Sequence, residues 1–260
     1  MTDRQSDEPV ILFLTAGGFN PWMIANRLAL RFPGLRIVLE QPESKRALLR
    51  RRARRFGWLS AFGQLATMIV SRLGKRFTTR RSEEIAREYG LSGTLDPEIP
   101  LRQVGDVNDP ETVALIAALK PAVIVTVSCR ILRKATLAAL SCPIINLHSG
   151  INPAYRGQMG GYWSLVSGDR DNFGATVHLV DEGVDTGRTL YQARTAPSPS
   201  DSMWTYPTLL TAISADGVER AVADALEGRL TPVETEGPSK LWFNVPIWTW
   251  LFHGLTKGIW

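Results

Sequence analysis

The chain contains only two cysteines and no long hydrophobic run. Cys129 and Cys142 lie in or beside apolar segments. Two thiols are too few for the disulfide framework of a small secreted domain, so we expect both to be buried and reduced. No stretch approaches the roughly eighteen apolar residues that a membrane-spanning helix requires, and the polar N-terminus carries no targeting pattern. These absences predict a cytoplasmic protein.

A complete G-x-G-x-x-G fingerprint is also missing, so the sequence does not indicate NAD binding. What is present is an alternation of strand-like and helix-like segments. Short apolar β-branched runs alternate with segments of helical periodicity, and the strands are expected at residues 10–15, 36–40, 121–127 and 143–147. Helices are expected up to Leu30 and at residues 110–119 and 131–140. This order predicts an α/β fold with a Rossmann-like, mostly parallel sheet and flanking helices.

Three polar residues stand where two of these strands end. Asn146 and His148 lie two residues apart, so their side chains point to the same face of the strand. Asp185 closes a second strand-like segment that breaks into an acidic, glycine-rich turn. Ligands of such sheets bind beyond the carboxyl ends of the strands. We therefore expect these residues to form an active site, in which Asp185 orients or charge-stabilises His148.

The two segments resemble the 10-formyltetrahydrofolate-dependent formyltransferases, which include the methionyl-tRNA, glycinamide ribonucleotide and sugar N-formyltransferases. The shared pattern reads Asn146-Leu147-His148, then Tyr155-Arg156-Gly157, then Asp-Glu-Gly-Val-Asp-Thr-Gly at residues 181–187. The resemblance covers roughly residues 121–192. Ser149 stands where the family usually has proline, so the resemblance leaves the path of the substrate loop open.

The resemblance implies an N-formyltransferase, and its chemistry suits these residues. An amine attacks the formyl carbon, and Asn146 can donate a hydrogen bond to the oxyanion, worth roughly 3–4 kcal/mol in other enzymes. His148 can stabilise the oxyanion when protonated or move protons between nitrogens. Asp185 would raise the pKa of His148 or take the amine proton through water. The reaction needs neither a covalent enzyme intermediate nor a metal.

The resemblance also implies that 10-formyltetrahydrofolate occupies a slot lined largely by main-chain groups of two loops. The residues concerned are Ser128, Arg130 and Leu132 in the first loop and Val180, Asp181, Glu182 and Val184 in the second. We expect Arg130 to contribute its backbone, with its side chain at the surface. His178 is expected to be structural, and His253 to have no chemical role.

Substrate binding is expected at Tyr155 and Arg156 of the second motif and at the turn that contains Gly18 and Asn20. Glycines before a helix N-terminus can bind a phosphate. The alternative, a tight turn between strand and helix without a ligand, remains open.

Residues 45–81 carry twelve of the thirty lysines and arginines, with a core at Arg50, Arg51, Arg52, Arg54 and Arg55. Apolar residues recur at helical spacing between the basic clusters, at Leu59, Phe62, Leu65, Met68, Ile69 and Leu73. This pattern predicts an amphipathic helix with basic ends. Such a helix can bind a membrane surface or polyanions. Alternatively, it packs its apolar face on the domain and leaves the basic face in water.

The last twenty residues hold four of the eight tryptophans. We expect this segment to pack against residues 56–73 and to leave some aromatic surface for a homodimer or a peripheral membrane contact. The predicted organisation is a catalytic domain at residues 1–200, with residues 45–81 as an insertion, followed by a helical, aromatic-rich extension at residues 201–260.

The function predicted from the sequence is formyl transfer to the primary amine of an amino sugar or a nucleotide-linked amino sugar, without a nucleic-acid partner. Two alternatives remain open. Water could replace the amine, which would make the chain a formyltetrahydrofolate hydrolase. The chain could also be a membrane-surface binding module that retains the fold without catalysis.

Overall fold

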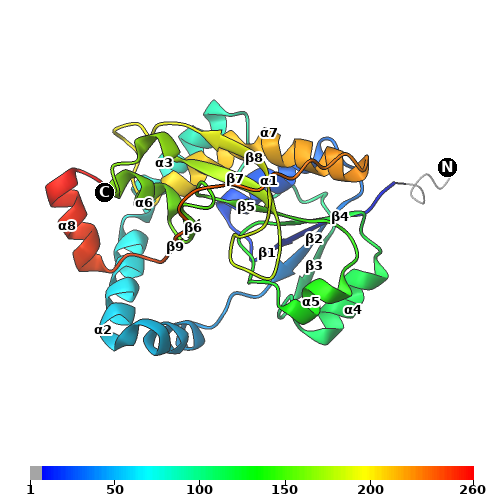
Figure 1. Ribbon diagram of the computed structural model, residues 1–260, viewed down its shortest axis with the longest axis horizontal. Helices are drawn as coiled ribbons and strands as arrows, with labels where there is room; N and C mark the ends of the chain where they lie inside the picture. The colour runs from blue at the N-terminus through cyan, green and yellow to red at the C-terminus, as the bar shows by residue number, and fades with distance from the viewer. Residues whose placement is uncertain (1–7) are drawn as a thin grey trace.

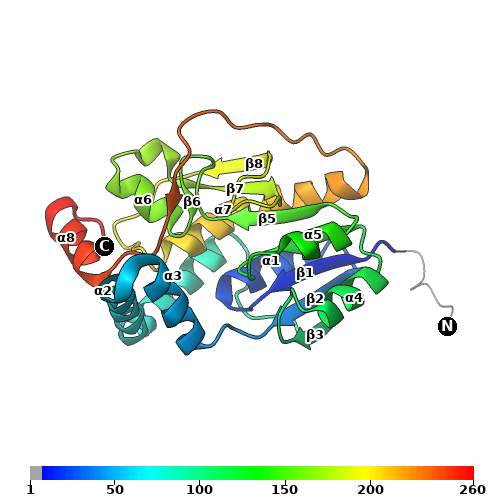
Figure 2. The ribbon, with the colours of Figure 1, turned by 60° about the horizontal axis from the view of Figure 1, so that its bottom comes forward.

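The computed structural model describes residues 8–260, apart from the side chains of residues 45, 71 and 75–77. Its centre is a seven-stranded sheet with helices on both faces (Figures 1 and 2). The strands are β1 (Ile11–Thr15), β2 (Leu35–Glu40), β3 (Leu101–Val104), β4 (Val123–Thr126), β5 (Ile144–His148), β7 (Gly174–Leu179) and β8 (Thr189–Arg194). A separate two-stranded sheet joins β6 (Arg156–Gly157) to β9 (Leu241–Trp242).

The helices are α1 (Phe19–Ala29), α2 (Lys45–Leu73), α3 (Lys75–Glu88), α4 (Pro110–Ala118), α5 (Lys134–Ala139), α6 (Gly160–Val166), α7 (Tyr206–Leu226) and α8 (Ile247–Lys257), with a 3-10 turn at Arg170–Asn172. The spatial order of the large sheet is β3-β2-β1-β4-β5-β7-β8. The first five strands are parallel, while β7 and β8 are antiparallel to their neighbours. The predicted Rossmann-like, mostly parallel sheet is therefore confirmed.

The inner strand β1, which lies between β2 and β4, shows that both faces of the sheet are covered. All of its apolar side chains are buried, as expected of a parallel strand covered on both sides. Ile11 and Phe13 belong to a core with α1, α3 and α7, whereas Leu12 and Leu14 belong to a second core with α4 and the loop before α5. The period-two alternation of a strand divides these residues between the two cores.

The predicted helix at residues 131–140 begins later than expected, at Lys134. The preceding residues form a loop that side chains from other elements hold in place. Asn108 accepts a hydrogen bond from the Arg133 N–H at 2.7 Å, and Glu40 accepts one from the Arg130 N–H at 2.6 Å. These bonds satisfy backbone donors outside a helix, so the loop does not need to become helical.

The basic segment forms two successive helices, α2 and α3, where the sequence predicted one. Helix α2 also bends at Gly57, whose φ is 79°. The side of α2 that packs on the protein carries Ala61, Gln64 and Thr67, all buried. The large apolar residues lie on the other side, and Leu59 and Leu73 are at least three-quarters exposed. The alternative in which α2 buries its large apolar face is therefore wrong.

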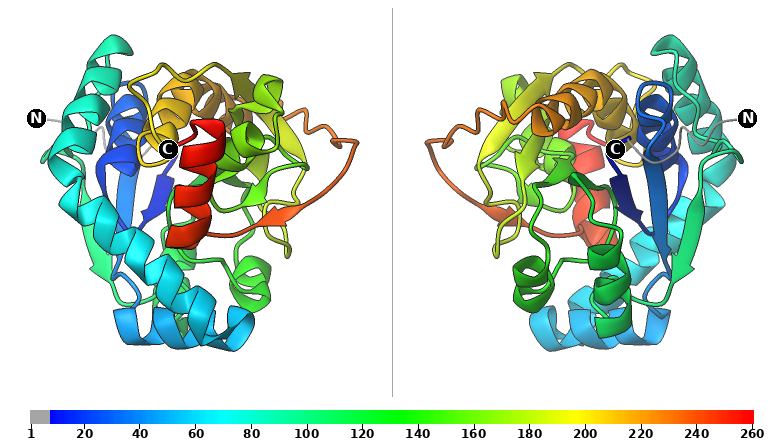
Figure 3. Two further views of the ribbon diagram at one scale, coloured as in Figure 1. Left: turned by 90° about the vertical axis from the view of Figure 1, so that its left-hand side faces the viewer. Right: turned by 90° about the vertical axis from the view of Figure 1, so that its right-hand side faces the viewer.

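The C-terminal segment packs against α2, as predicted. Thr67 donates a hydrogen bond from its hydroxyl to the Val245 carbonyl at 3.0 Å, and the rings of Phe56 and Phe243 lie 4.7 Å apart. The two helices approach closely at Gly63, where a Cβ atom would lie 2.3 Å from the Trp248 ring. Figure 3 shows α8 crossing in front of the sheet, beside α2.

The predicted domain boundary at residue 200 needs correction. Helix α7 follows it, yet residues such as Leu210, Val218 and Val222 are buried in the main core with β1 and α1. Helix α7 is therefore part of the catalytic domain, and the extension is limited to the segment after it. Within residues 8–260, no helix is both long and apolar enough to cross a membrane.

Helix α3 is joined to the segment before α7 by a buried ion pair. Arg81 donates from Nε to the Asp201 carboxylate at 2.8 Å, and Asp201 is completely buried. Its neighbour Arg80 pairs with Glu84 at 3.1 Å but is 84% exposed. The two arginines are adjacent in sequence, but Arg81 is 15% exposed and also pairs with Glu84 and Glu88, so they compare a buried ion-pair site with an exposed one.

We expect Arg81→Met to lower the free energy of unfolding by about 3–5 kcal/mol, because it removes the cation that pairs with the buried Asp201 charge and leaves it with the hydrogen bonds from Ser198 and Thr205. Arg80→Met should cost about 0.5 kcal/mol or less, since exposed ion pairs contribute little. Urea denaturation followed by circular dichroism measures both. Equal losses in the two variants would show that the Arg81–Asp201 pair is not the stabilising contact.

Candidate active site

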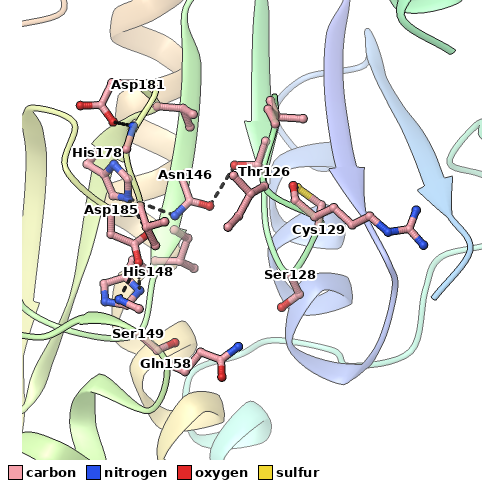
Figure 4. A pocket seen from close by; sticks show the side chains of 18 of the residues that line it. Thr126, Ser128, Cys129, Asn146, His148, Ser149, Gln158, His178, Asp181 and Asp185 are labelled. Atoms are coloured by element: carbon pink, nitrogen blue, oxygen red, sulfur yellow. Dashed lines mark hydrogen bonds and ion pairs between the residues drawn. The ribbon is translucent and has the colours of Figure 1, made fainter. Parts of the chain in front are cut away.

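A cavity of about 490 Å³ opens where β4 and β5 end. It lies beyond the carboxyl ends of two parallel strands, the position at which such sheets bind ligands. Asn146, His148 and Asp185 all line it, together with His178 and Thr126 (Figure 4). The structure thus brings the three predicted catalytic residues into one cavity.

Asp185 lies between two imidazoles. One carboxylate oxygen is 3.5 Å from Nδ1 of His148, and the other is 3.4 Å from Nε2 of His178. The main-chain N–H of Gly157 also donates to the carboxylate at 2.8 Å. Asp185 has a left-handed backbone conformation with φ of 50°, which is strained for a non-glycine residue. The surrounding contacts hold the turn in this conformation.

Asp185 is an anion at neutral pH. Burial alone would raise the pKa of its carboxyl group. The imidazoles of His148 and His178 and the Gly157 N–H oppose this effect and together hold the pKa at about 2. A buried carboxylate of this kind is a fixed negative charge inside the cavity.

His148 is buried, and its ring is oriented from both sides. Nε2 lies 2.7 Å from the Tyr155 carbonyl, which can only accept, so this nitrogen carries a proton. Gly150 allows the approach, because a Cβ atom there would lie 2.6 Å from Nε2. Burial lowers the pKa of His148 below its ordinary value of 6.5, and this effect exceeds the opposing influence of Asp185. His148 is therefore neutral at neutral pH, with a lone pair on Nδ1 beside Asp185.

His178, which we expected to be structural, lines the cavity and contacts two of the candidate catalytic residues. Its Nδ1 donates to the Leu179 carbonyl at 2.7 Å. Its Nε2 lies 3.0 Å from the side-chain nitrogen of Asn146 and 3.4 Å from the Asp185 carboxylate. Both histidines therefore contribute to the site, and His178 acts by positioning Asn146.

The amide of Asn146 has a fixed orientation. Thr126, the last residue of β4, donates from its hydroxyl to Asn146 Oδ1 at 2.9 Å. With Oδ1 on Thr126 and one N–H on His178, the second N–H of Asn146 remains for a ligand. Thr126 was not identified from the sequence. It is the last residue of the strand that pairs with β5, and this position could have indicated a residue next to Asn146.

The first predicted folate loop lines the cavity with Ser128, Arg130 and Leu132. The Arg130 side chain pairs with Glu40 at 3.1 Å and with Asp106 at 3.3 Å, and its main-chain N–H, which we expected to contribute to the slot, donates to Glu40 instead. Leu132 has neither its N–H nor its C=O hydrogen-bonded to any residue in the described part of the chain. These main-chain groups can therefore bind a ligand.

In the second loop, Val180, Asp181 and Val184 line the cavity, but Glu182 does not. The Glu182 carboxylate pairs with Lys134 at 3.0 Å at the surface. Gly187 lets this loop pass close to β7, because a Cβ atom there would lie 1.7 Å from the Leu179 carbonyl oxygen. Glu182, which we expected to line the folate slot, therefore lies outside the cavity lining.

Tyr155 and Arg156 were predicted to bind substrate, but neither side chain lines the cavity. Tyr155 is buried, and its hydroxyl donates to Asp169 at 2.8 Å. Arg156 donates to the Val184 carbonyl at 3.1 Å. Both residues therefore contact residues of the site without lining the cavity themselves. Tyr155 orients His148 through its carbonyl, and Arg156 holds the acidic turn.

Gly18 and Asn20 also lie outside the cavity lining. Asn20 accepts a hydrogen bond from the Thr208 hydroxyl at 2.8 Å, so its side chain joins α1 to α7. Gly18 has φ of 116°, a conformation that glycine adopts without strain. These contacts favour the alternative of a tight turn between β1 and α1 over an anion site.

Besides Thr126, the cavity is lined by three uncharged polar residues that the sequence did not identify as ligand contacts: Ser149, Gln158 and Asn244. Within residues 8–260, their side chains hydrogen-bond to no other residue, as Figure 4 illustrates for Ser149 and Gln158. Ser149 follows His148 directly, where the resemblance had already marked a departure from the family pattern. Asn244 comes from the C-terminal segment, which no local pattern connects to the site.

Comparison with known proteins gives a consistent result. The profile of the formyl transferase family matches residues 81–214. The methionyl-tRNA formyltransferase of Chlorobium chlorochromatii is 34% identical over 141 residues, which cover 54% of this chain and 45% of the relative. The chain spans about half the length of the curated relatives it matches.

Solved structures share the fold at low sequence identity. Glycinamide ribonucleotide transformylase 1 from Symbiobacterium toebii superimposes with a TM-score of 0.55 at 20% identity, covering 93% of this chain and 99% of that one. The N-formyltransferase from Helicobacter canadensis gives a TM-score of 0.57 at 10% identity, covering 89% and 70%. The family profile extends over half of the chain and includes Asn146, His148 and Asp185. This chain belongs to the formyl transferase family.

Proposed function

We propose that the protein is an N-formyltransferase that transfers the formyl group of 10-formyltetrahydrofolate to the primary amine of an amino sugar. The observation that carries this proposal is the buried cluster of Asn146, His148 and Asp185 in one cavity of a formyl transferase family member. An anionic carboxylate, a neutral imidazole and an oriented amide are what acyl transfer between two nitrogens requires.

Asn146 would act on the developing oxyanion. When the amine attacks the formyl carbon, the carbonyl oxygen gains negative charge. Thr126 and His178 hold the amide so that one N–H stays available for that oxygen. A donor that is oriented before the reaction stabilises the transition state without a cost of reorganisation at that step.

His148 and Asp185 would move the proton. The neutral ring of His148 has its lone pair on Nδ1, 3.5 Å from the Asp185 carboxylate. Uptake of the proton that the amine loses creates an imidazolium beside an existing anion, which is favourable in a buried site. The same proton is then available for N10 of the folate when the C–N bond breaks, leaving the formylated amine and tetrahydrofolate.

The two loops fit the formyl donor. Among residues 8–260, the N–H and C=O of Leu132 have no hydrogen-bond partner, and Ile131 beside it lines the cavity with an apolar side chain that is 65% exposed. A flat heterocycle with amide-like edges needs main-chain donors and acceptors next to an apolar wall. The Helicobacter canadensis relative was solved with folinic acid, a reduced folate.

The amino-sugar acceptor is inferred from the polarity of the remaining wall. Ser149, Gln158 and Asn244 are uncharged and have no partners among the described residues, so they suit hydroxyl groups. Arg130 is the basic residue of the lining, and it is paired with Glu40 and Asp106. A wall of this composition favours a polyhydroxylated acceptor over a phosphate. The Helicobacter canadensis relative was solved with dTDP-3-aminofucose.

The acceptor class is tested by a formyl-transfer assay with 10-formyltetrahydrofolate. The panel contains nucleotide-linked amino sugars, free amino sugars, glycinamide ribonucleotide and methionyl-tRNA. We expect the highest kcat/KM with an amino sugar. Preference for either of the last two acceptors would refute the amino-sugar assignment, and release of formate without any acceptor product would identify a hydrolase.

Asp185→Asn should lower kcat/KM by about a hundred- to ten-thousand-fold, the range of general acid–base catalysis, because the amide cannot stabilise the imidazolium. Binding of 5-formyltetrahydrofolate, measured by calorimetry, should persist. The matched control is Asp216→Asn, the same chemical change at an exposed position of α7, which should leave kcat/KM unchanged. Activity within threefold of the unsubstituted protein for Asp185→Asn would rule out the proposed role.

The protonation of His148 can be measured directly, because the chain has only three histidines. We expect NMR titration to give His148 a pKa below 6.5, since burial disfavours its charged form. Asp185→Asn should lower this pKa further, because the carboxylate favours the imidazolium. His148→Gln assigns the resonance. A pKa above 6.5, or a rise in the Asp185→Asn variant, would contradict the neutral resting state.

A further inference from the structure

Most of the large apolar side chains that are exposed in residues 8–260 gather on two helices. On α2 they are Trp58, Leu59, Phe62, Met68, Ile69 and Leu73, and on α8 and the residues after it they are Trp248, Leu251, Phe252, Leu255 and Trp260. Only five others, Leu30, Tyr89, Leu101, Ile131 and Val233, come from the rest of the described chain. Scattered exposed apolar residues are ordinary, whereas a gathering of this size marks an interaction surface.

On each helix these residues follow one side. On α2, whole helical turns of about four or seven residues separate Trp58, Phe62, Ile69 and Leu73. On α8, three or four residues separate Trp248 from the Leu251–Phe252 pair, and that pair from Leu255. The two sides adjoin, because Gly63 of α2 contacts the Trp248 ring. Both helices lie at the same end of the molecule and face the viewer in Figure 3, left. We call the exposed apolar residues of these two helices the α2–α8 face.

The α2–α8 face continues into a cluster of arginines on the first half of α2. Arg46, Arg50, Arg51, Arg54 and Arg55 are exposed. Residues 45–81 contain no Asp or Glu, and neither do residues 237–260. In the described part of the chain, Arg51 pairs with Glu43, and the other four of these arginines form no ion pair. The guanidinium of Arg55 lies over the Phe243 ring, 4.5 Å from its centre. This end of the protein is therefore both apolar and strongly positive.

We propose that the α2–α8 face docks on the surface of an anionic lipid bilayer. Exposed Trp, Phe, Leu and Ile would enter the boundary between headgroups and acyl chains, and the arginines would bind the lipid phosphates. The charge argues against a second copy of this chain, because two such faces would bring their arginines together. The aliphatic residues Leu59, Ile69 and Leu255 argue against nucleic acid, since aliphatic side chains provide no surface for base stacking.

The docking face is joined to the cavity by one segment. Phe243 packs against Phe56 of α2, and the next residue, Asn244, lines the cavity. A bilayer bound by this face would therefore lie near the segment that carries Asn244. The proposal itself is independent of the transfer reaction, because it depends on the exposed residues of α2 and α8.

The test is flotation of the whole protein with vesicles of phosphatidylcholine alone and of equal parts phosphatidylcholine and phosphatidylglycerol. We expect binding to the anionic vesicles at low salt. Binding should weaken in molar salt, where the screening length falls to about 3 Å. Tryptophan fluorescence should be quenched by brominated acyl chains, because Trp58 and Trp248 would lie in the interface.

Two pairs of variants separate charge from apolar contact. Arg50→Glu with Arg54→Glu should weaken binding by at least about twenty-five-fold, since each basic residue near such a surface is worth about fivefold. Its control is Arg36→Glu with Arg102→Glu, on exposed positions of β2 and β3. Phe62→Ser with Ile69→Ser should also weaken binding at least tenfold, and its control is Leu30→Ser with Val233→Ser. All four substitute exposed residues, and circular dichroism checks that each protein is folded.

Loss of vesicle binding in both α2 variants, with binding retained in both controls, supports the proposal. No binding to anionic vesicles at low salt overturns it, and so does equal binding by the α2 variants. A dimer in light scattering that Phe62→Ser with Ile69→Ser dissociates would assign the face to a second copy instead. Binding of RNA without binding of vesicles would assign the arginines to nucleic acid.

Discussion

The buried carboxylate of Asp185 is the constraint on which the rest of the site depends. Removing a carboxylate from water costs several kcal/mol unless partners compensate for the lost hydration. Here the partners are His148 on β5, His178 on β7 and the Gly157 N–H on β6. Because they come from three strands, the position of one charge fixes how these strands meet. It also holds the acidic turn in its strained conformation.

The small second sheet connects Asp185 to the C-terminal segment of the chain. Gly157 donates to Asp185 and pairs with Trp242 of β9, and a Cβ atom at Gly157 would lie 2.3 Å from the Trp242 carbonyl oxygen. β9 leads directly into the segment that packs on α2. The tryptophan-rich C-terminal segment therefore lies beside the cavity in addition to forming a surface of its own. Its polar residue Asn244 becomes part of the cavity for this reason.

Helix α2 shows why helical periodicity alone can mislead. The spacing of its large apolar residues predicts an amphipathic helix, and the helix exists, but its inward side consists of Ala61, Gly63, Gln64 and Thr67. The close approach of α8 leaves no room for a side chain at Gly63, and the large apolar residues of α2 face outward. A pattern identifies the side of a helix that is apolar. Whether that side meets protein, lipid or a second chain depends on what packs against the opposite side.

The sequence by itself determined the alternating fold and the central site. Apolar β-branched runs can be satisfied only as buried strands, and Asn146 and His148 share a face because side chains alternate along a strand. Only the tertiary structure decided the partners of these residues. Thr126, His178, Gln158 and Asn244 come from four separate elements, so no local pattern connects them. Tyr155 belongs to the family-like motif, and Gly18 belongs to a turn for which a ligand-free role had remained open; both lie outside the cavity, because a local pattern specifies backbone conformation and not the direction in which the folded chain presents it.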